Sequence, residues 1–227
     1  MSHEIRTPLN AIVGFIQFFE NDVPVEQRKE YIDLINSSSA HLMKLIDGII
    51  DVSKIEAHQM TIKPVTLGLN EMMNELRMNF ENHLKNSEKK NLSLILDNSL
   101  TIENCTIQVD AVRLRQILDN LLGNAFKFTE KGSIRFGYRQ SAPEELEFVV
   151  ADTGIGLAPQ QQEIIFERFR QVETGYNRQY GGFGLGLSIS RSLVQLMGGK
   201  MWVESKEGEG AAFYFTIPYK PVEIFDF

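Results

Sequence analysis

Apolar residues in the first 56 positions recur at helical spacing and predict two helices. In the first helix they run from residue 5 to about residue 19, at Leu9, Ile12, Val13, Ile16 and Phe19. A polar break ending in Pro24 predicts the boundary between the helices. The second helix extends to about Glu56. Its stripe follows alternating steps of four and three residues, as in a heptad seam: Tyr31, Ile35, Ser38, Leu42, Leu45, Ile49 and Val52.

A hairpin of two such helices cannot bury this stripe by itself. Either the stripe packs on the rest of the same chain, or two hairpins dimerise into a four-helix bundle, which would bury it. The spacing alone favours neither arrangement.

After Lys63-Pro64 the pattern alternates between helical and strand periods, and we place a domain boundary near residues 60–66. The predicted helices span residues 69–85, 111–126 and 185–197. The predicted strands span residues 92–96, 106–109, 133–138, 146–151, 201–205 and 212–217. The predicted fold class is α+β: a helical hairpin (residues 1–62), then an α/β sandwich with helices on one face (residues 66–219), and a tail (residues 220–227).

Composition narrows the function classes. The chain has 227 residues, 43% hydrophobic and 23% charged, which is typical of a globular protein with one or two domains. A net charge of −7 without a basic stripe argues against nucleic acid as a partner. Cys105 is the only cysteine, which fits a reducing, cytoplasmic setting. No apolar run approaches the roughly 18–20 residues that span a bilayer, so we expect membrane contact only through segments upstream.

The stretch Ser2-His3-Glu4-Ile5-Arg6-Thr7-Pro8-Leu9 carries candidate chemistry. The His3 imidazole is largely neutral near pH 7, so a ring nitrogen can attack phosphorus. Thr7 lies one helical turn on and shares a face with His3. Pro8 removes a backbone N–H and predicts a bend. Because the motif begins before a helix cap could fit, we expect a fragment of a longer protein.

A second candidate lies on the predicted helix over residues 111–126 and just beyond it. Asn120, Asn124 and Lys127 are spaced by four and three residues and share one helix face. Asparagine oxygens suit Mg²⁺ and add no charge against a triphosphate, and Lys127 adds a compact positive charge. A merely solvated face is the ordinary alternative, although asparagine is a poor helix former.

Two glycine-rich segments complete the candidates. Asp152-Thr153-Gly154-Ile155-Gly156 follows a buried-looking strand and can bring backbone close to a ligand. Residues 181–187 (GGFGLGL) lead into a helix whose exposed N–H groups suit phosphate. Between Phe166-Glu167-Arg168-Phe169 and this loop, residues 170–180 are polar, which is typical of a lid. Each segment alone is a weak signal.

Ser-His-Glu-Ile-Arg-Thr-Pro-Leu-Asn resembles the H box of sensor histidine kinases of two-component systems. The later segments resemble, in order, the N, G1, F and G2 boxes of the catalytic domain of these kinases. That domain has the Bergerat-type ATP fold shared with gyrase, the Hsp90 chaperones and MutL. The resemblance covers residues 1–219. It implies a homodimer that uses ATP and Mg²⁺ to phosphorylate His3. The phosphoryl group then passes to an Asp of a response-regulator receiver domain, separate or fused downstream, and phosphatase activity is compatible with the resemblance.

The resemblance also implies a role for each matching residue. His3 is the phosphoacceptor, Glu4 the general base and Thr7 a candidate for positioning water. Neighbouring side chains on a helix point about 100° apart, so the Glu4 side chain has to bend around the helix to contact the His3 ring. Asn124 is the main Mg²⁺ ligand, with Asn120 beside it on metal or phosphate. The other predicted ATP-binding residues are Lys127 on phosphate, Asp152 on adenine, and Phe128, Gly154, Gly156, Phe166, Phe169, Arg170, Gly182, Gly184, Gly186 and Leu187 around the pocket and lid.

Two other functions remain open at this point. One is an ATP-binding dimeric interaction module without autokinase activity, against which the intact His3 and Asn124 argue. The other is an ATPase clamp of the gyrase or chaperone type, against which the H box and heptad hairpin argue.

Overall fold

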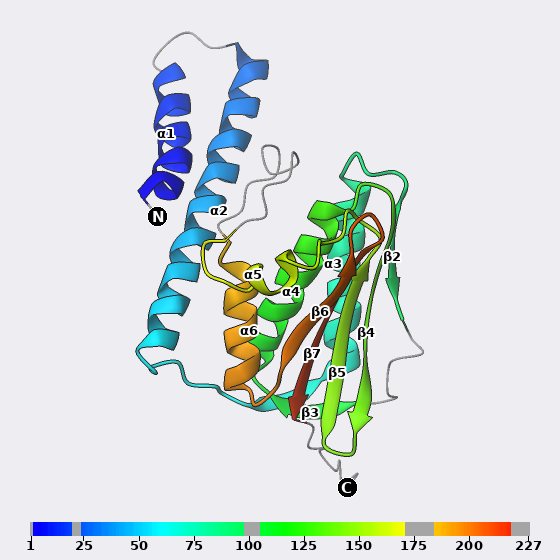
Figure 1. Cartoon of the computed structure of the whole chain (residues 1–227). Helices are drawn as coiled ribbons and strands as arrows, with labels where there is room; N and C mark the ends of the chain where they lie inside the picture. The colour runs from blue at the N-terminus through cyan, green and yellow to red at the C-terminus, as the bar shows by residue number, and fades with distance from the viewer. Residues whose placement is uncertain (1, 20–23, 98–104, 171–183, 219–227) are drawn as a thin grey trace, which may run out of the picture. The chain divides into compact units, whose positions relative to one another are not determined.

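A computed structural model of the chain describes residues 2–19, 24–97, 105–170 and 184–218 (Figure 1). The chain forms two compact units, residues 1–60 and residues 61–227. None of the described helices is both long and apolar enough to cross a bilayer.

The first unit is the predicted helical hairpin, with α1 (Ser2–Phe18) and α2 (Val25–Glu56). Pro8 lies inside α1. Near the connected ends, the Tyr31 ring packs on three aromatic rings, with centroids 5.6, 5.5 and 6.1 Å from those of Phe15, Phe18 and Phe19. The first residue of the predicted heptad stripe therefore packs within its own hairpin.

Other apolar side chains of the hairpin are exposed. Ile5, Leu9, Val13 and Ile16 form one stripe along α1 and are 36–51% exposed. On α2, Ile32, Met43, Ile46 and Ile50 are 38–57% exposed, whereas every residue of the predicted heptad stripe is less than 36% exposed. The hairpin thus buries much of one apolar surface and leaves a second one open to water.

The second unit is built on a five-stranded sheet of order β2-β4-β5-β7-β6. Its strands are β2 (Leu92–Leu96), β4 (Gly132–Ala142), β5 (Glu145–Asp152), β6 (Met201–Lys206) and β7 (Gly210–Pro218). β2 pairs with β4 in parallel, and the other neighbours are antiparallel. A separate antiparallel pair joins β1 (Val65–Gly68) to β3 (Thr106–Val109). The sequence analysis missed β1, because part of this strand falls in the predicted domain boundary near residues 60–66.

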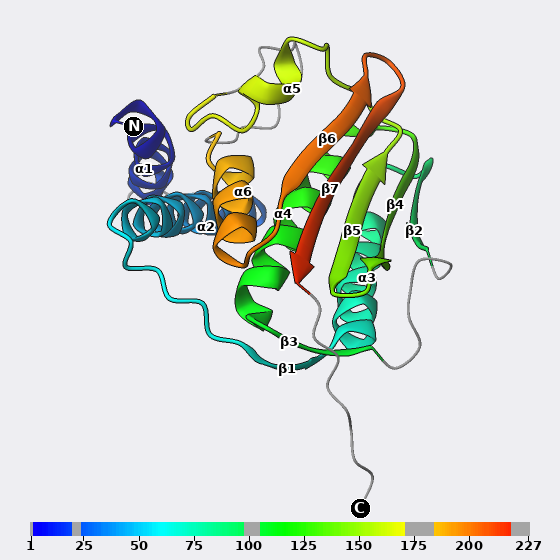
Figure 2. The same cartoon turned by 60° about the horizontal axis from the view of Figure 1, so that its bottom comes forward.

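Three helices cover one face of this sheet (Figure 2). They are α3 (Leu69–Lys85), α4 (Ala111–Phe128) and α6 (Gly186–Leu196), and a one-turn helix, α5 (Gln161–Ile164), was not predicted. The predicted α+β fold with helices on one sheet face is confirmed. α4 is two residues longer than predicted, so Lys127 and Phe128 belong to the helix.

The interior of this unit lies between the helices and the inner face of the sheet. Alternate residues of the central strands point inward, and Phe148 of β5 is fully buried. Its ring stacks on Phe215 of β7 at 4.6 Å and 3°, and lies 5.6 Å from Tyr138 of β4. These three rings join the central strands into the layer on which α4 packs.

The start of α4 is fixed by Asp110. One oxygen of its carboxylate accepts the N–H of Arg113 at 3.1 Å, as expected of an N-cap, and the other accepts the N–H of Lys63 at 2.9 Å. The segment before β1 is therefore tied to the helix that carries the candidate site.

We expect Phe148→Ala to lower the free energy of unfolding by about 3–5 kcal/mol, because it removes the ring between Tyr138 and Phe215 and leaves a cavity. Urea denaturation of the whole chain measures this change. The matched control is Val112→Ala on α4, where the side chain is 72% exposed. Its expected effect is within about 0.5 kcal/mol. Equal effects of the two substitutions would contradict the buried stack.

Candidate functional site

The candidate site is organised along the polar side of α4. Leu121, Leu122 and Ala125 are buried, whereas Asn124 and Lys127 remain partly exposed. The amphipathic character of α4 thus orients the asparagine and lysine side chains away from the core.

Asn120 connects α4 to the start of α6. Its side-chain nitrogen donates a hydrogen bond to the Ser190 hydroxyl oxygen at 3.0 Å. Its side-chain oxygen lies so close to Gly186 that a Cβ there would overlap it. A side chain at position 186 would therefore displace the Asn120 amide, and the first turn of α6 lies directly beside Asn120.

The other end of α4 meets the loop after β5. The carbonyl oxygen of Phe128 occupies the space that a Cβ on Gly154 would need, and it accepts the N–H of Ile155 at 3.4 Å. Gly156 has φ 66° and packs against the backbone of Lys206, so it too excludes a side chain. One helix thus contacts both glycine-rich segments that the sequence analysis selected.

Asp152 ends β5 beside this loop. Burial raises the pKa of its carboxyl group, and hydrogen bonds from the N–H groups of Gly154 and Ala211 oppose the rise. The Thr129 hydroxyl also lies close enough to oppose it, but it is fully buried without a well-aligned hydrogen-bond partner. A buried hydroxyl of this kind indicates a place where a ligand or water completes the hydrogen bonding.

Lys127 is the cation of the site. Burial lowers the pKa of its ammonium group, because the charged form loses contact with water. The nitrogen lies 4.8 Å from the centre of the Phe128 ring, a favourable cation–π distance. An anion bound here would favour the charged form, so the environment of Lys127 fits a phosphate ligand.

Residues near the two ends of the predicted lid segment contact each other. The N–H of Phe169 donates to the carbonyl oxygen of Gly184 at 2.9 Å, and a Cβ on Gly184 would overlap the backbone of Arg170. Gly184 has φ 62° and Phe169 has φ 60°, which is rare for a residue other than glycine. Most of the lid, with Gly182, lies outside the described residues.

Phe166 anchors the segment that leads to the lid. Its buried ring packs edge-on against Phe213, with centroids 6.4 Å apart. The guanidinium of Arg191 on α6 lies 4.7 Å from the ring centre and also pairs with Glu163 at 3.4 Å. The start of the lid segment is therefore attached to the helix that begins at Gly186.

The remaining candidates lie at the start of the chain and of α6. His3 and Glu4 belong to α1, but their side chains lie outside the described part. Thr7 is exposed on α1, and Leu187 lies in the first turn of α6. Sequence reasoning gave no role to Thr129 or Ser190. Thr129 directly follows Phe128, whereas nothing in the sequence pointed to Ser190.

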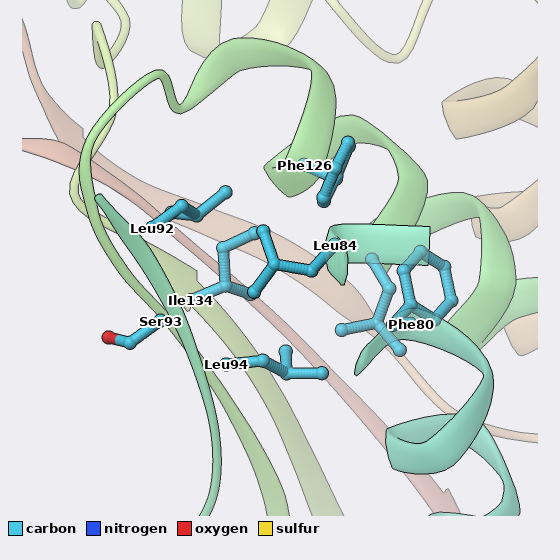
Figure 3. Close-up of a pocket in the computed structure, with 8 residues that line it drawn as sticks. Phe80, Leu84, Leu92, Ser93, Leu94, Phe126 and Ile134 are labelled. Carbon is cyan, nitrogen blue, oxygen red and sulfur yellow. The ribbon is translucent and has the colours of Figure 1, made fainter. Parts of the chain in front are cut away.

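A small apolar hollow lies elsewhere in this unit, between α3, β2 and α4 (Figure 3). Phe80, Leu84, Leu92, Phe126 and Ile134 are among its lining residues. None of the predicted site residues lines it, so it is a gap in the core rather than the nucleotide site.

Comparison with known families agrees with this arrangement. Residues 109–221 match the histidine kinase-, DNA gyrase B- and HSP90-like ATPases, and residues 1–58 match the His Kinase A (phospho-acceptor) domain. The chain belongs to the sensor histidine kinases. This histidine-kinase core is 37% identical over 231 residues to the autoinducer 2 sensor kinase/phosphatase LuxQ of Vibrio parahaemolyticus, covering 98% of the chain and 26% of LuxQ. The chain thus spans about a quarter of the length of such curated relatives.

Solved histidine kinases share the fold. Full-length ShkA in complex with AMPPNP is 32% identical, with a TM-score of 0.75, and the match covers 97% of this chain and 45% of ShkA. Histidine kinase ThkA in complex with the response regulator protein TrrA is 27% identical, with a TM-score of 0.66, and the match covers 97% of this chain and 60% of that one.

We expect Asp152→Asn to raise the melting temperature of the unliganded chain at pH 7. The raised pKa means that the folded protein holds this proton more tightly than the unfolded chain does. Ionisation of Asp152 therefore destabilises the fold as the pH rises from the unfolded value of about 3.8 through the folded one. The neutral amide avoids this loss, and its advantage should shrink as the pH is lowered towards 4. Thermal unfolding across this pH range measures the effect, with Asp47→Asn on exposed α2 as the control. A lower melting temperature at pH 7 would contradict it.

Proposed function

We propose that this histidine-kinase core binds ATP along α4 and transfers the γ-phosphoryl group to His3. The observation that carries the proposal is the position of α4 between two glycine turns. Asn120 lies against Gly186, and Phe128 lies against Gly154. The groups suited to metal, phosphate and base recognition are therefore gathered along one helix.

Asp152 is the adenine-recognition group of this proposal. Its carboxylate accepts a hydrogen bond from the exocyclic amine of adenine, whereas guanine would present a carbonyl oxygen and be repelled. Gly154 and Gly156 let the loop beside Asp152 pack closely against the backbone of Phe128 and Lys206. The Thr129 hydroxyl, buried next to Asp152, is available to orient the carboxylate or a bridging water.

The phosphates of ATP are bound by Asn124, Asn120 and Lys127. The Asn124 oxygen suits Mg²⁺, and Asn120, held by Ser190, presents its oxygen beside Gly186. Mg²⁺ held by Asn124 and Asn120 would neutralise part of the triphosphate charge. Burial lowers the pKa of the Lys127 ammonium group, and a phosphate beside it would stabilise its charged form. Phe128 keeps the Lys127 chain in place through its ring.

The lid closes over the nucleotide in this proposal. Phe166, Phe169 and Arg170 fix its first end, and Gly182 and Gly184 act as hinges at the second. The backbone N–H groups of Gly186 and Leu187, in the first turn of α6, face phosphate at the positive end of the helix dipole.

His3 receives the phosphoryl group. A ring nitrogen attacks the γ-phosphorus in line, and the bond to the bridging β–γ oxygen breaks as ADP leaves with the electron pair. Glu4 accepts the imidazole proton that phosphorylation makes acidic. Catalysis therefore rests on positioning and on charge neutralisation at the phosphates.

An Asp carboxylate of a receiver domain then takes the phosphoryl group from His3. The complex of ThkA with a response regulator supports such a partner for this chain. Because the relatives are about four times longer, they leave room for a receiver fused downstream as well as for a separate one.

Residues 1–62 form the dimerisation and phosphotransfer domain, residues 66–219 the ATP-binding catalytic domain, and residues 220–227 a tail. The match to the phospho-acceptor domain and the exposed apolar stripes of α1 and α2 support a homodimer. A second hairpin would cover these stripes in a four-helix bundle. The cytoplasm, where ATP is abundant, is the compartment that fits this activity.

Incubation with γ-labelled ATP and Mg²⁺ tests the proposed autokinase. We expect acid-labile, base-stable label on the unchanged chain and none on His3→Ala or Asn124→Ala. His3→Ala should still bind ATP, whereas Asn124→Ala should bind it at least about tenfold more weakly, because a metal ligand is lost. ATP binding without label on the unchanged chain would favour an interaction module. ATP hydrolysis that survives His3→Ala would favour an ATPase clamp.

Thr7 tests the proposed phosphatase activity. We expect Thr7→Ala to slow dephosphorylation of a phosphorylated receiver roughly tenfold, the effect of one lost hydrogen bond to water, and to leave autophosphorylation unchanged. Thr7→Ser keeps the hydroxyl and should behave like the unchanged chain. Loss of both activities to the same extent in Thr7→Ala would contradict this role.

A further inference from the structure

The last carbonyl groups of α4 need partners, because the helix ends without a glycine cap. Its final residue is Phe128, and Thr129 continues in an extended conformation with φ −115° and ψ 113°. A helix end of this kind leaves its last carbonyl oxygens without partners inside the helix. One of them, that of Phe128, accepts the N–H of Ile155 at 3.4 Å.

Lys89 binds the neighbouring carbonyl groups. Its ammonium nitrogen donates to the carbonyl oxygens of Phe126 at 2.8 Å and Thr129 at 3.1 Å, and more weakly to that of Lys127 at 3.4 Å. It also pairs with the carboxylate of Glu130 at 3.3 Å. A cation at the C-terminal end of a helix is further stabilised by the helix dipole. One side chain from another part of the sequence therefore fixes the end of the helix that carries the site.

The surroundings of Lys89 indicate a preformed anchor. Its side chain is only 8% exposed, and burying an ammonium group is costly unless it is paired. The turn that carries it is ordered by its own hydrogen bonds, including one from the Lys89 N–H to the Ser87 hydroxyl at 3.3 Å and one from the Leu92 N–H to the Lys89 carbonyl at 3.2 Å. Lys89 is thus held by the hydrogen bonds of its own turn and by the carbonyl groups at the end of α4.

Contacts of the Phe126 ring also support this end of α4. The ring lies beside the small apolar hollow between α3, β2 and α4 (Figure 3). The imidazole of His83 on α3 meets it edge-on, with centroids 4.7 Å apart. The Lys89 ammonium lies 5.1 Å from the centre of the same ring and adds a cation–π contact there.

We propose that Lys89 is a positioning residue of the ATP site. It holds the segment from Phe126 to Thr129, and therefore sets where Lys127, Phe128 and Thr129 stand relative to the nucleotide. The Phe128 carbonyl in turn supports the loop of Gly154 and Asp152. Loss of the Lys89 cation frees the last turn of α4 and moves the phosphate-binding and adenine-binding groups together. This inference rests on the ATP site proposed above.

Titration with a fluorescent trinitrophenyl analogue of ATP and Mg²⁺ tests the inference, on the whole chain and well below its melting temperature. We expect Lys89→Met, which keeps the length of the side chain without its charge, to raise the Kd about tenfold. Lys89→Arg keeps the charge and should recover most of the affinity. The control Lys90→Met removes the exposed neighbouring lysine of equal charge, and its Kd should change less than about twofold.

The outcomes separate positioning from stability. A folded Lys89→Met chain with a lower melting temperature and an unchanged Kd would overturn the proposal, because Lys89 would then only stabilise the fold. If Lys89→Met is unfolded at the assay temperature, Lys89→Gln replaces it, since the amide retains two N–H donors. It must still weaken binding more than Lys90→Gln, and equal binding overturns the proposal. If the unchanged chain fails to bind the analogue, the proposed ATP site is itself wrong, and the positioning role falls with it.

Discussion

Two glycines stand where α4 leaves no room for a side chain. The Phe128 carbonyl oxygen lies against Gly154, and the Asn120 side-chain amide lies against Gly186. On its other side, α4 packs a row of buried leucine, isoleucine and alanine side chains against the core. The helix is therefore confined on both sides, and the spacing between the loop of Gly154 and Gly156, the polar residues of α4 and the first turn of α6 follows from that confinement. A methyl group on Gly154 would overlap the backbone of α4, and one on Gly186 would displace the Asn120 amide from its present position.

The same confinement holds two charged groups in unfavourable surroundings. Burial raises the pKa of Asp152 and lowers that of Lys127, so the ionised form of each is disfavoured without a ligand. In the proposed site, a nucleotide would offer a hydrogen-bond donor to the carboxylate and a negative charge to the ammonium. Binding of ATP would then relieve a cost that is already present in the unliganded protein. Sites of this kind commonly trade stability for function.

Most of the fold could be predicted from the sequence, because its elements are long enough to show their periods. The α3 helix and the strands β2 and β3 begin and end where the pattern indicated. The strand β1 was missed because part of it falls in the predicted domain boundary near residues 60–66, and α5 was missed because a single turn shows no helical period. The hairpin shows a further limit. Spacing identified the stripe that begins at Tyr31, but only the structure separates it from the second, exposed apolar surface of α1 and α2.

The site was partly predictable for a different reason. Asn120 and Lys127 share a helix, so their relation follows from helical geometry alone. Ser190 meets Asn120 across 70 positions, and Lys89 reaches Thr129 across 40. Such contacts depend on how whole elements pack, and neither serine nor lysine is unusual where it stands in the sequence. The residues that contact a ligand can therefore be found from motifs more readily than the residues that hold them in place.

The hydrogen bond between Phe169 and Gly184 has a consequence for how the sequence can change. Gly184 has φ 62°, and a Cβ there would overlap the backbone of Arg170. Any other residue at this position would therefore strain the backbone and push Arg170 away, which would break the hydrogen bond to Phe169. Evolution can exchange most exposed residues of this domain, but position 184 has to stay glycine for as long as the segment before the lid remains attached beside the start of α6.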